Sequence, residues 1–303
     1  MESKDIVIIG GGVAGLSAGL YASRSGMDSV VIDAGGGGQV LEIYNLENYP
    51  GIFPAENGTE LIENLTKQAK SFGAKIVYSE VLSIDKKNNL FFVKTSNAEF
   101  TAKAVIYATG AAHSKLGIPG EEKLAGAGVS YCAVCDGPFF KNRKVVVIGG
   151  GDSACSEALY LSNIASHVDL IHRRNELRAA KSITEKVLEN QKIEIHFNSV
   201  AKEIIGEEKV SGINIENVET KQISLLETDA VFIFVGMEPR TELLETLKKD
   251  ENGYIITDEK MATSVPGLFI AGDVRSKPLR QIITAASDGA VAAVCAAQYI
   301  KNI

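Results

Sequence analysis

The sequence predicts an α/β protein in which one structural pattern is used twice. Each copy has a short apolar strand, a glycine-rich turn, a helical run and a second strand, and the copies begin at Asp5 and Lys144. The second strand of the first copy leads into Asp33, and that of the second copy leads into His172. Strands that alternate with helices are typical of parallel sheets covered by helices. We therefore expect two similar α/β domains.

Length and composition agree with two soluble domains. The 303 residues are enough for two ordinary cores, and 45% of them are apolar and 23% charged, as in average globular proteins. Lys and Arg total 31 against 38 Asp and Glu, so the formal net charge is -7. This balance disfavours nucleic acid or an anionic membrane as the main partner and favours a small-molecule or protein substrate.

The first copy has the sequence context of a dinucleotide-binding turn. A strand at Asp5–Ile9 precedes the turn Gly10-Gly-Gly-Val-Ala-Gly15, a helical run extends to about Gly26, and a strand at Ser29–Ile32 ends at Asp33. A glycine motif alone is weak, but here the strands and the closing acid are present. The pattern predicts a Rossmann-like dinucleotide-binding domain.

Each conspicuous residue of this turn has an expected role. Gly10 permits the tight turn, Gly12 lets the backbone approach a pyrophosphate, and Gly15 lets the helix pack on the strand. Asp33 is expected to accept hydrogen bonds from a ribose hydroxyl.

The second copy repeats the pattern with one change. A strand at Lys144–Ile148 precedes Gly149-Gly-Gly-Asp-Ser-Ala154, a helical run extends to Ser162, and a strand at His167–Ile171 ends at His172. We expect Gly149, Gly151 and Ala154 to form the corresponding nucleotide turn.

A basic cluster replaces the acid at the end of the second copy. The offset from Gly10 to Asp33 equals that from Gly149 to His172, so the two endings correspond. The cluster suits a 2′-phosphate, and two charged hydrogen bonds of about 1.5 to 3 kcal/mol each favour NADPH over NADH by about a hundredfold or more. The alternative is a solvated basic loop. The cluster consists of His172, Arg173, Arg174 and Arg178.

The chain after the second copy contains a further strand and a long helix. Gly267–Asp273 is expected to hold a buried strand, and a helical run extends from about Gln281 to Ile300. This arrangement resembles the isoalloxazine end of a flavin site, where a helix N-terminus stabilises negative charge on the reduced flavin. The alternative is an ordinary helix that packs on a sheet.

The stretch Tyr131-Cys-Ala-Val-Cys-Asp-Gly137 holds two of the four cysteines. A lone Cys-x-x-Cys in a reducing compartment is more often catalytic or metal-binding than structural. A zinc module that uses Cys132 and Cys135 is the competing interpretation, but no second Cys-x-x-Cys exists and the four histidines show no paired ligand spacing. We therefore expect no metal, and we assign no role to Cys155 or Cys295, which are expected to be buried.

The uncharged run from Ile6 to Ala22 does not predict a signal peptide or a membrane span. Glycines interrupt it, and it lacks the flanking features of a signal peptide and the length of a span. We expect a cytoplasmic protein that does not bind a membrane.

With these parts in order, the chain resembles the bacterial-type, low-molecular-weight thioredoxin reductases over nearly its whole length. The matching motifs are Gly10–Gly15, Gly37-Gly-Gln39, Glu47-Asn-Tyr-Pro-Gly51, Ala108-Thr-Gly110, Cys132–Gly137, Gly149–Gly151, His172–Arg174 with Arg178, and Ala271-Gly-Asp273 with Arg280-Gln281.

The resemblance implies a domain order that the motifs alone do not give. An FAD domain formed by residues 1–115 and 242–303 would hold an inserted NADPH domain, residues 116–241, which carries the Cys-x-x-Cys. In this family the inserted domain is thought to rotate about hinges, here near Gly117 and Arg240, and the protein is usually a homodimer.

The resemblance also implies the electron path and the site residues. Hydride passes from NADPH to FAD, electrons pass to the Cys132–Cys135 disulfide, and the dithiol reduces a disulfide substrate, by family thioredoxin. Cys135 would face the flavin, Cys132 would attack the substrate, and Asp136 would protonate the outgoing thiolate, although Asp is also common as a turn residue. The implied cofactor-binding residues beyond the two turns are Gly38, Gln39, Asn48, Gly110, Asp273, Arg280 and Gln281.

Two departures from the family pattern affect affinity more than activity. Asp33 stands where Glu is common, which shortens the reach to the ribose, and Ala286-Ser287-Asp288-Gly289 replaces a more usual Ala-Gly-Asp-Gly. Same-fold dithiol oxidases and ferredoxin-fed reductases remain alternatives, but those relatives often lack the basic cluster that this chain has.

Overall fold

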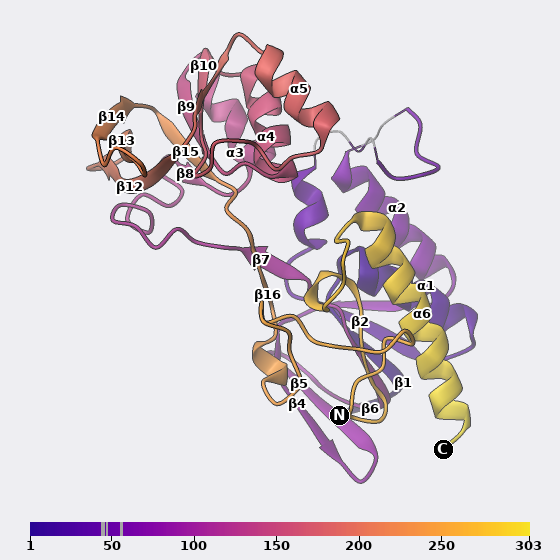
Figure 1. Ribbon diagram of the computed structural model, residues 1–303. Helices are drawn as coiled ribbons and strands as arrows, with labels where there is room; N and C mark the ends of the chain where they lie inside the picture. The colour runs from indigo at the N-terminus through magenta and orange to yellow at the C-terminus, as the bar shows by residue number, and fades with distance from the viewer. Residues whose placement is uncertain (44–45, 47, 55–56) are drawn as a thin grey trace. The chain divides into compact units, whose positions relative to one another are not determined.

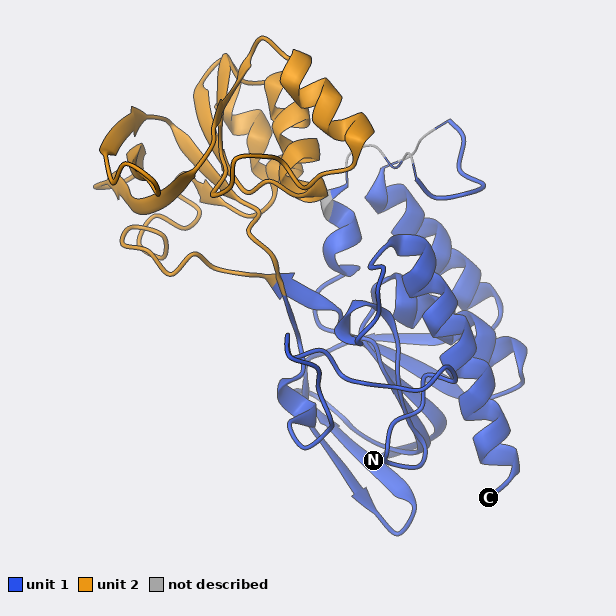
Figure 2. Cartoon of the chain, viewed as in Figure 1, with its two compact units in different colours: residues 1–112, 238–303 blue, residues 113–237 orange. Residues whose placement is uncertain are grey.

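The computed structural model describes residues 1–43, 46, 48–54 and 57–303, which form two compact units (Figures 1 and 2). Unit 1 combines residues 1–112 with 238–303, and unit 2 spans residues 113–237. The unit boundaries lie three and four residues before the domain boundaries expected from the sequence. Both ends of the chain therefore belong to unit 1.

Unit 1 contains a seven-stranded sheet with the strand order β3-β2-β1-β6-β5-β4, and β17 pairs with β6. The pairs that include β1, β2, β3 and β17 are parallel, whereas β4, β5 and β6 form an antiparallel meander. The strands are β1 (Glu2–Ile9), β2 (Ser29–Asp33), β3 (Lys75–Tyr78), β4 (Val81–Lys87), β5 (Leu90–Thr95), β6 (Glu99–Tyr107) and β17 (Leu268–Ile270).

Alternate residues of β1 build the two cores of unit 1. Ile6 and Ile8 pack with alanines of the α1 and α6 helices, which lie side by side, while Val7 and Ile9 face the second cluster (Figure 1). By length and hydropathy alone α6 could cross a membrane, but Ala292, Ala293 and Ala296 in it are fully buried in the core. The helices are α1 (Val13–Arg24), α2 (Gly58–Ser71) and α6 (Ile282–Lys301), with 3₁₀ turns η1 (Gly38–Glu42), η3 (Glu242–Leu244) and η4 (Gly272–Val274).

Unit 2 contains a five-stranded parallel sheet with the order β11-β10-β9-β15-β8. Val145 and Val147 face a helix-covered core, whereas Val146 and Ile148 share a core with residues of a three-stranded antiparallel sheet. The strands are β8 (Val129–Ser130), β9 (Lys144–Ile148), β10 (His167–Ile171), β11 (Ile193–His196), β12 (Ser199–Gly206), β13 (Val210–Asn217), β14 (Ile223–Glu227) and β15 (Ala230–Ile233); the helices are α3 (Ala133–Asp136), η2 (Gly137–Phe140), α4 (Asp152–Ser162) and α5 (Lys181–Glu189).

The two segments that connect the units pair with each other as the strands β7 (Ala111–His113) and β16 (Met237–Pro239). The returning segment is then fixed to unit 1 at Arg240. The Arg240 carbonyl accepts hydrogen bonds from the Tyr107 hydroxyl at 2.9 Å and the Thr109 hydroxyl at 2.8 Å, and its N–H donates to the Gly110 carbonyl.

A buried carboxylate organises the loop that opens unit 2. Glu121 is 1% exposed and accepts hydrogen bonds from the Leu116 N–H at 2.9 Å, the Gly117 N–H at 2.6 Å and the Tyr131 hydroxyl at 2.6 Å. Burial by itself favours the neutral acid, but these hydrogen bonds outweigh it and hold the pKa of Glu121 below its ordinary value. Burial and the neighbouring Glu121 raise the pKa of Tyr131. The ionised Glu121 therefore ties the start of unit 2 to the strand that leads to the cysteines.

We predict that Glu121→Gln lowers the free energy of unfolding by about 2 kcal/mol at pH 7, because hydrogen bonds to a charged group are lost and an amide N–H₂ faces backbone donors. A carboxyl with a lowered folded-state pKa stabilises the fold above its unfolded value and loses this effect as the pH falls. The stabilities of both proteins in denaturant titrations should therefore begin to converge as the pH falls below about 4.5 and meet only below the lowered folded-state pKa. A difference that stays constant with pH would contradict the charged role of Glu121.

Candidate active site

The turn after β1 brings a helix unusually close to a strand. Gly10 has φ +113°, and a Cβ at this position would lie 2.2 Å from the Ala108 carbonyl oxygen. A Cβ at Gly15 would lie 1.8 Å from the Gly10 carbonyl oxygen, so only glycine allows this approach. The α1 helix begins directly after Gly12, where its free N–H groups lie at the end of the sheet.

Asp33 closes the same turn from the end of β2. Asp33 is 7% exposed, and its carboxylate accepts hydrogen bonds from the Gly35 N–H at 3.1 Å and the Gly36 N–H at 2.8 Å. A Cβ at Gly11 would lie 2.3 Å from Asp33 Cγ, so the acid rests directly on the glycine turn. Two hydrogen bonds leave acceptor capacity on the carboxylate for a ligand hydroxyl.

Unit 2 contains the corresponding turn with a different closing residue. Gly149 has φ +150°, and a Cβ there would lie 2.4 Å from the Phe234 carbonyl oxygen and 2.5 Å from Ala154 Cβ. A Cβ at Gly150 would lie 2.1 Å from His172 Nδ1. His172 therefore occupies in unit 2 the position that Asp33 occupies in unit 1.

His172 lies at the centre of the predicted basic cluster. It is 4% exposed, and its Nε2 is buried with no hydrogen-bond partner among the described residues. Burial lowers the pKa of His172, and the charges of Arg178, Arg174 and Arg173 lower it further. The three arginines are exposed, and the Arg178 N–H donates to the Gly150 carbonyl at 2.7 Å. A positively charged cluster with an unpaired imidazole nitrogen among the described residues suits an anionic ligand group.

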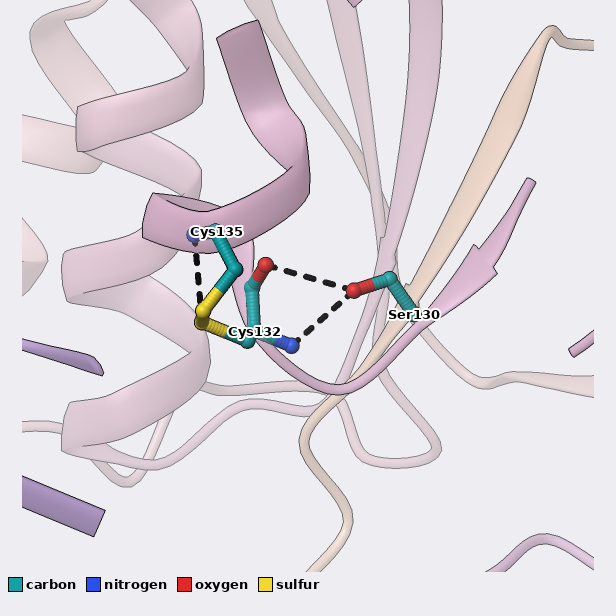
Figure 3. The surroundings of a disulfide bond; sticks show 3 residues. All are labelled: Ser130, Cys132 and Cys135. Carbon is teal, nitrogen blue, oxygen red and sulfur yellow. Dashed lines mark hydrogen bonds between the residues drawn. A yellow bond between two sulfur atoms is a disulfide. The ribbon is translucent and has the colours of Figure 1, made fainter. Parts of the chain in front are cut away.

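The two cysteines of the Cys-x-x-Cys form a disulfide in unit 2 (Figure 3). Cys132 precedes the short α3 helix, and the Cys135 N–H donates to Cys132 Sγ at 3.1 Å. Ser130 fixes the approach to this turn, since the Cys132 N–H donates to Ser130 Oγ at 3.0 Å and that hydroxyl donates to the Cys132 carbonyl at 3.2 Å. Cys135 is exposed and Cys132 is partly exposed, so this disulfide is accessible within unit 2.

The C-terminal part of unit 1 holds a cluster of buried charges. Asp288 accepts hydrogen bonds from the Gly272 N–H, from Arg275 at 3.0 Å and from Lys277 at 3.1 Å. Lys277 also forms an ion pair with Asp273 at 3.0 Å. This network holds Asp273 in the η4 turn that follows β17, and Lys277 connects it to Thr284 in the first turn of α6.

Four further predicted residues make contacts between segments of unit 1. Asn48 donates to the Gln281 side chain at 3.0 Å, and Gln281 immediately precedes α6. Gln39 donates to the Ala111 carbonyl at 2.6 Å. Arg280 lies 3.6 Å above the Tyr254 ring.

The structure therefore brings the predicted site residues together in two separate groups. Those of the N- and C-terminal segments lie in unit 1, and the cysteines, Asp136 and the basic cluster lie in unit 2. Glu47 lies outside the described residues. Ser130, Arg275 and Lys277 were missed by sequence reasoning because single polar residues next to strands carry no pattern of their own.

Two nucleotide turns and an accessible disulfide define a nucleotide-dependent disulfide oxidoreductase. A family model described as pyridine nucleotide-disulphide oxidoreductase matches residues 4–289. A thioredoxin reductase of Treponema pallidum (strain Nichols) is 51% identical over 99% of this chain and 98% of its own length.

Solved structures of thioredoxin reductases are also similar to this chain over nearly its whole length. The thioredoxin reductase of Lactococcus lactis has a TM-score of 0.96 at 42% identity and covers 99% of this chain and 100% of its own. That of T. acidophilum has a TM-score of 0.93 at 38% identity, with 98% of this chain and 99% of its own covered. The chain belongs to the pyridine nucleotide-disulphide oxidoreductases and, within them, to the family of bacterial thioredoxin reductases.

The cofactors of this family are FAD and NADPH, and the described residues fit both. In unit 1 the glycine turn ends at an acid with free acceptor capacity. In unit 2 an equivalent turn ends at a buried imidazole nitrogen that lacks a partner among the described residues and lies near three exposed arginines.

A matched pair of glycines separates folding from nucleotide binding. We predict that Gly149→Ala lowers the free energy of unfolding by about 2 kcal/mol or more, because of its positive φ and the backbone contact. Gly151 has φ -95°, and a Cβ there meets no atom of the described chain within 4 Å. Gly151→Ala should therefore cost less than about 1 kcal/mol in denaturant titrations, while weakening NADPH binding. Equal destabilisation by both substitutions would be inconsistent with this division.

Proposed function

We propose that the chain reduces the disulfide of thioredoxin with electrons from NADPH. The observation that carries the proposal is the accessible Cys132–Cys135 disulfide in the same unit as a nucleotide turn with a basic end. The thioredoxin reductases of Treponema pallidum and Lactococcus lactis support thioredoxin as the substrate.

The two turns divide the cofactors between the units. When bound, FAD provides a two-electron acceptor for the hydride of NADPH and a donor to the disulfide. We assign FAD to unit 1 and NADPH to unit 2. The residues assigned to FAD are Gly10, Gly12, Gly15, Asp33, Gly38, Gln39, Asn48, Gly110, Asp273, Arg280 and Gln281, and those assigned to NADPH are Gly149, Gly151, Ala154, His172, Arg173, Arg174 and Arg178.

The closing residues of the turns provide the discrimination between nucleotides. Asp33 would accept from a ribose hydroxyl, since its carboxylate keeps free lone pairs beside the turn. At His172 the absence of a partner for Nε2 among the described residues and the three nearby arginines favour a 2′-phosphate.

The hydrogen bond within the Cys-x-x-Cys supports the proposed roles of the two thiols. After reduction, the Cys135 N–H that donates to Cys132 Sγ would stabilise a thiolate at Cys132, which is the nucleophilic form. Cys132 then attacks a substrate sulfur and releases one substrate thiol. Cys135 attacks Cys132 Sγ in the mixed disulfide, which releases the second thiol and restores the Cys132–Cys135 disulfide. Two electrons and two protons are transferred to the substrate.

Asp136 is proposed to protonate the departing thiolate. Its backbone is fixed by the hydrogen bond from its N–H to the Cys132 carbonyl at 3.1 Å. Asp136 also lines a cavity of about 340 Å³ together with Phe139, a residue that is 81% exposed. An exposed aromatic residue four positions after Cys135 favours a protein substrate.

The remaining assignments follow the family. We propose a cytoplasmic homodimer, without membrane or nucleic-acid partners, in which unit 2 rotates about the segments near Gly117 and Arg240. The pairing of β7 with β16, which brings the two connecting segments side by side, supports this proposal.

Anaerobic addition of nucleotide tests the donor site. We predict that NADPH bleaches the flavin absorbance rapidly and NADH much more slowly. Arg173→Ala and Arg174→Ala should each raise the apparent Kd for NADPH by about tenfold through loss of a charged contact, with little change for NADH. Lys202→Ala, which removes an exposed charge elsewhere in unit 2, is the control. Equal bleaching by both nucleotides in the parent protein would refute the phosphate assignment.

A cysteine variant tests the electron path. We predict that Cys135→Ser still takes up hydride, so that NADPH bleaches the flavin, but does not reduce thioredoxin because no disulfide can form with Cys132. The two steps are measured separately by anaerobic absorbance and by thiol release from thioredoxin. Thioredoxin reduction that survives in this variant would show that the assigned path is wrong.

A further inference from the structure

Unit 2 contains a second cluster of reactive side chains away from the cysteines. His167 and Asp169 lie two positions apart on β10. Glu194 and His196 lie two positions apart on β11, the edge strand of the parallel sheet. Asp169 pairs with Glu194 in the strand register. Residues two apart on a strand, and residues opposite each other on neighbouring strands, share one face of a sheet. The register therefore gathers all four side chains on one face.

The atoms of this cluster are close enough to share one ion. His167 Nε2 lies 3.5 Å from Asp169 Oδ1 and 3.7 Å from Glu194 Oε2, and all three of these atoms lie within 4.8 Å of one another. Nitrogen and oxygen ligands at about 2.0 to 2.2 Å from a tetrahedral zinc ion stand roughly 3.3 to 3.5 Å apart. Small side-chain adjustments would therefore bring the three atoms to coordination distance of one ion, with a water as the fourth ligand.

The net charge of the cluster and the hydrogen bond that holds one of its carboxylates also suit a divalent cation. Two carboxylates and a neutral imidazole carry a net charge that one divalent ion balances. Among the described residues, no lysine or arginine forms an ion pair with Asp169 or Glu194. His196 Nε2 lies 2.6 Å from Asp169 Oδ1 and holds that carboxylate in place, as residues next to metal ligands commonly do.

We propose that His167, Asp169 and Glu194 bind a divalent transition-metal ion of the zinc class, with His196 as the residue that positions Asp169. The sequence led us to expect no metal, because the four histidines show no paired spacing. The strand register brings His167 and His196 to Asp169, an arrangement that the sequence spacing did not predict.

The ion would fasten the edge strand to the sheet. Asp169 and Glu194 belong to neighbouring strands, and at the end of the same ladder the His172 N–H donates to the His196 carbonyl at 3.0 Å. The site is separate from the Cys-x-x-Cys and does not depend on the proposed reaction.

The test is zinc binding to the untagged full-length chain with the Cys132–Cys135 disulfide intact, so that these thiols cannot bind the metal. After chelator treatment, equilibrium dialysis against micromolar zinc should give one ion per chain. His167→Asn and Glu194→Gln should each weaken binding by about tenfold or more, and His196→Gln by about 10- to 100-fold. Glu189→Gln, an exposed glutamate at the end of α5, is the matched control.

Glu194 is 64% exposed, so Glu194→Gln should fold normally, and circular dichroism checks that it does. A Cys132→Ser, Cys135→Ser double variant should keep its zinc. The proposal is overturned by less than stoichiometric zinc in the parent chain, by full binding in both His167→Asn and Glu194→Gln, or by loss of zinc in the double cysteine variant.

Discussion

The close approach of a helix to the end of a parallel strand determines how the rest of this molecule is arranged. In unit 1 the Gly10 carbonyl occupies the space that a Cβ at Gly15 would need, with a separation of 1.8 Å. This contact places the first turn of α1 at the edge of the sheet, where its N–H groups are free to meet an anionic ligand. In unit 2 the third residue of α4 is Ala154, where α1 has Gly15, and a Cβ at Gly149 would lie 2.5 Å from Ala154 Cβ. The two units therefore form the same strand-turn-helix arrangement with different residues in contact at the turn.

Because the turn is so compact, the residue at the end of the next strand lies directly on it and decides the charge of the site. Asp33 rests on Gly11 in unit 1 and His172 rests on Gly150 in unit 2. The acid is held by two backbone N–H groups, whereas burial and three arginines keep the pKa of the imidazole low. An anionic ligand near His172 would offset the arginine charges and raise that pKa again, so binding would be coupled to proton uptake.

The local patterns in the sequence predicted the parts of the fold that repeat. The strands Lys144–Ile148 and His167–Ile171 and the end of the helix at Ser162 have the expected bounds, because buried apolar runs and glycines determine them locally. The antiparallel strands β4 and β5 and the sheet formed by β12, β13 and β14 were not predicted. The residues of β4, β12 and β14 alternate weakly between buried and exposed, whereas those of β5 alternate regularly, and the pairing of these strands depends on contacts with the rest of each unit.

Sites built across strands were the hardest to predict, and the reason is physical. Cys132 and Cys135 are neighbours in sequence, so their spacing alone brings the two sulfurs together. His167 and His196 are brought to the same carboxylate only because Asp169 pairs with Glu194 in the ladder. A shift of one residue in that register would move Glu194 and His196 to the opposite face of the sheet. A cluster of reactive side chains from neighbouring strands therefore depends on strand register. That register is specified by the buried cores on both faces of the sheet and not by the spacing of the reactive residues in the sequence.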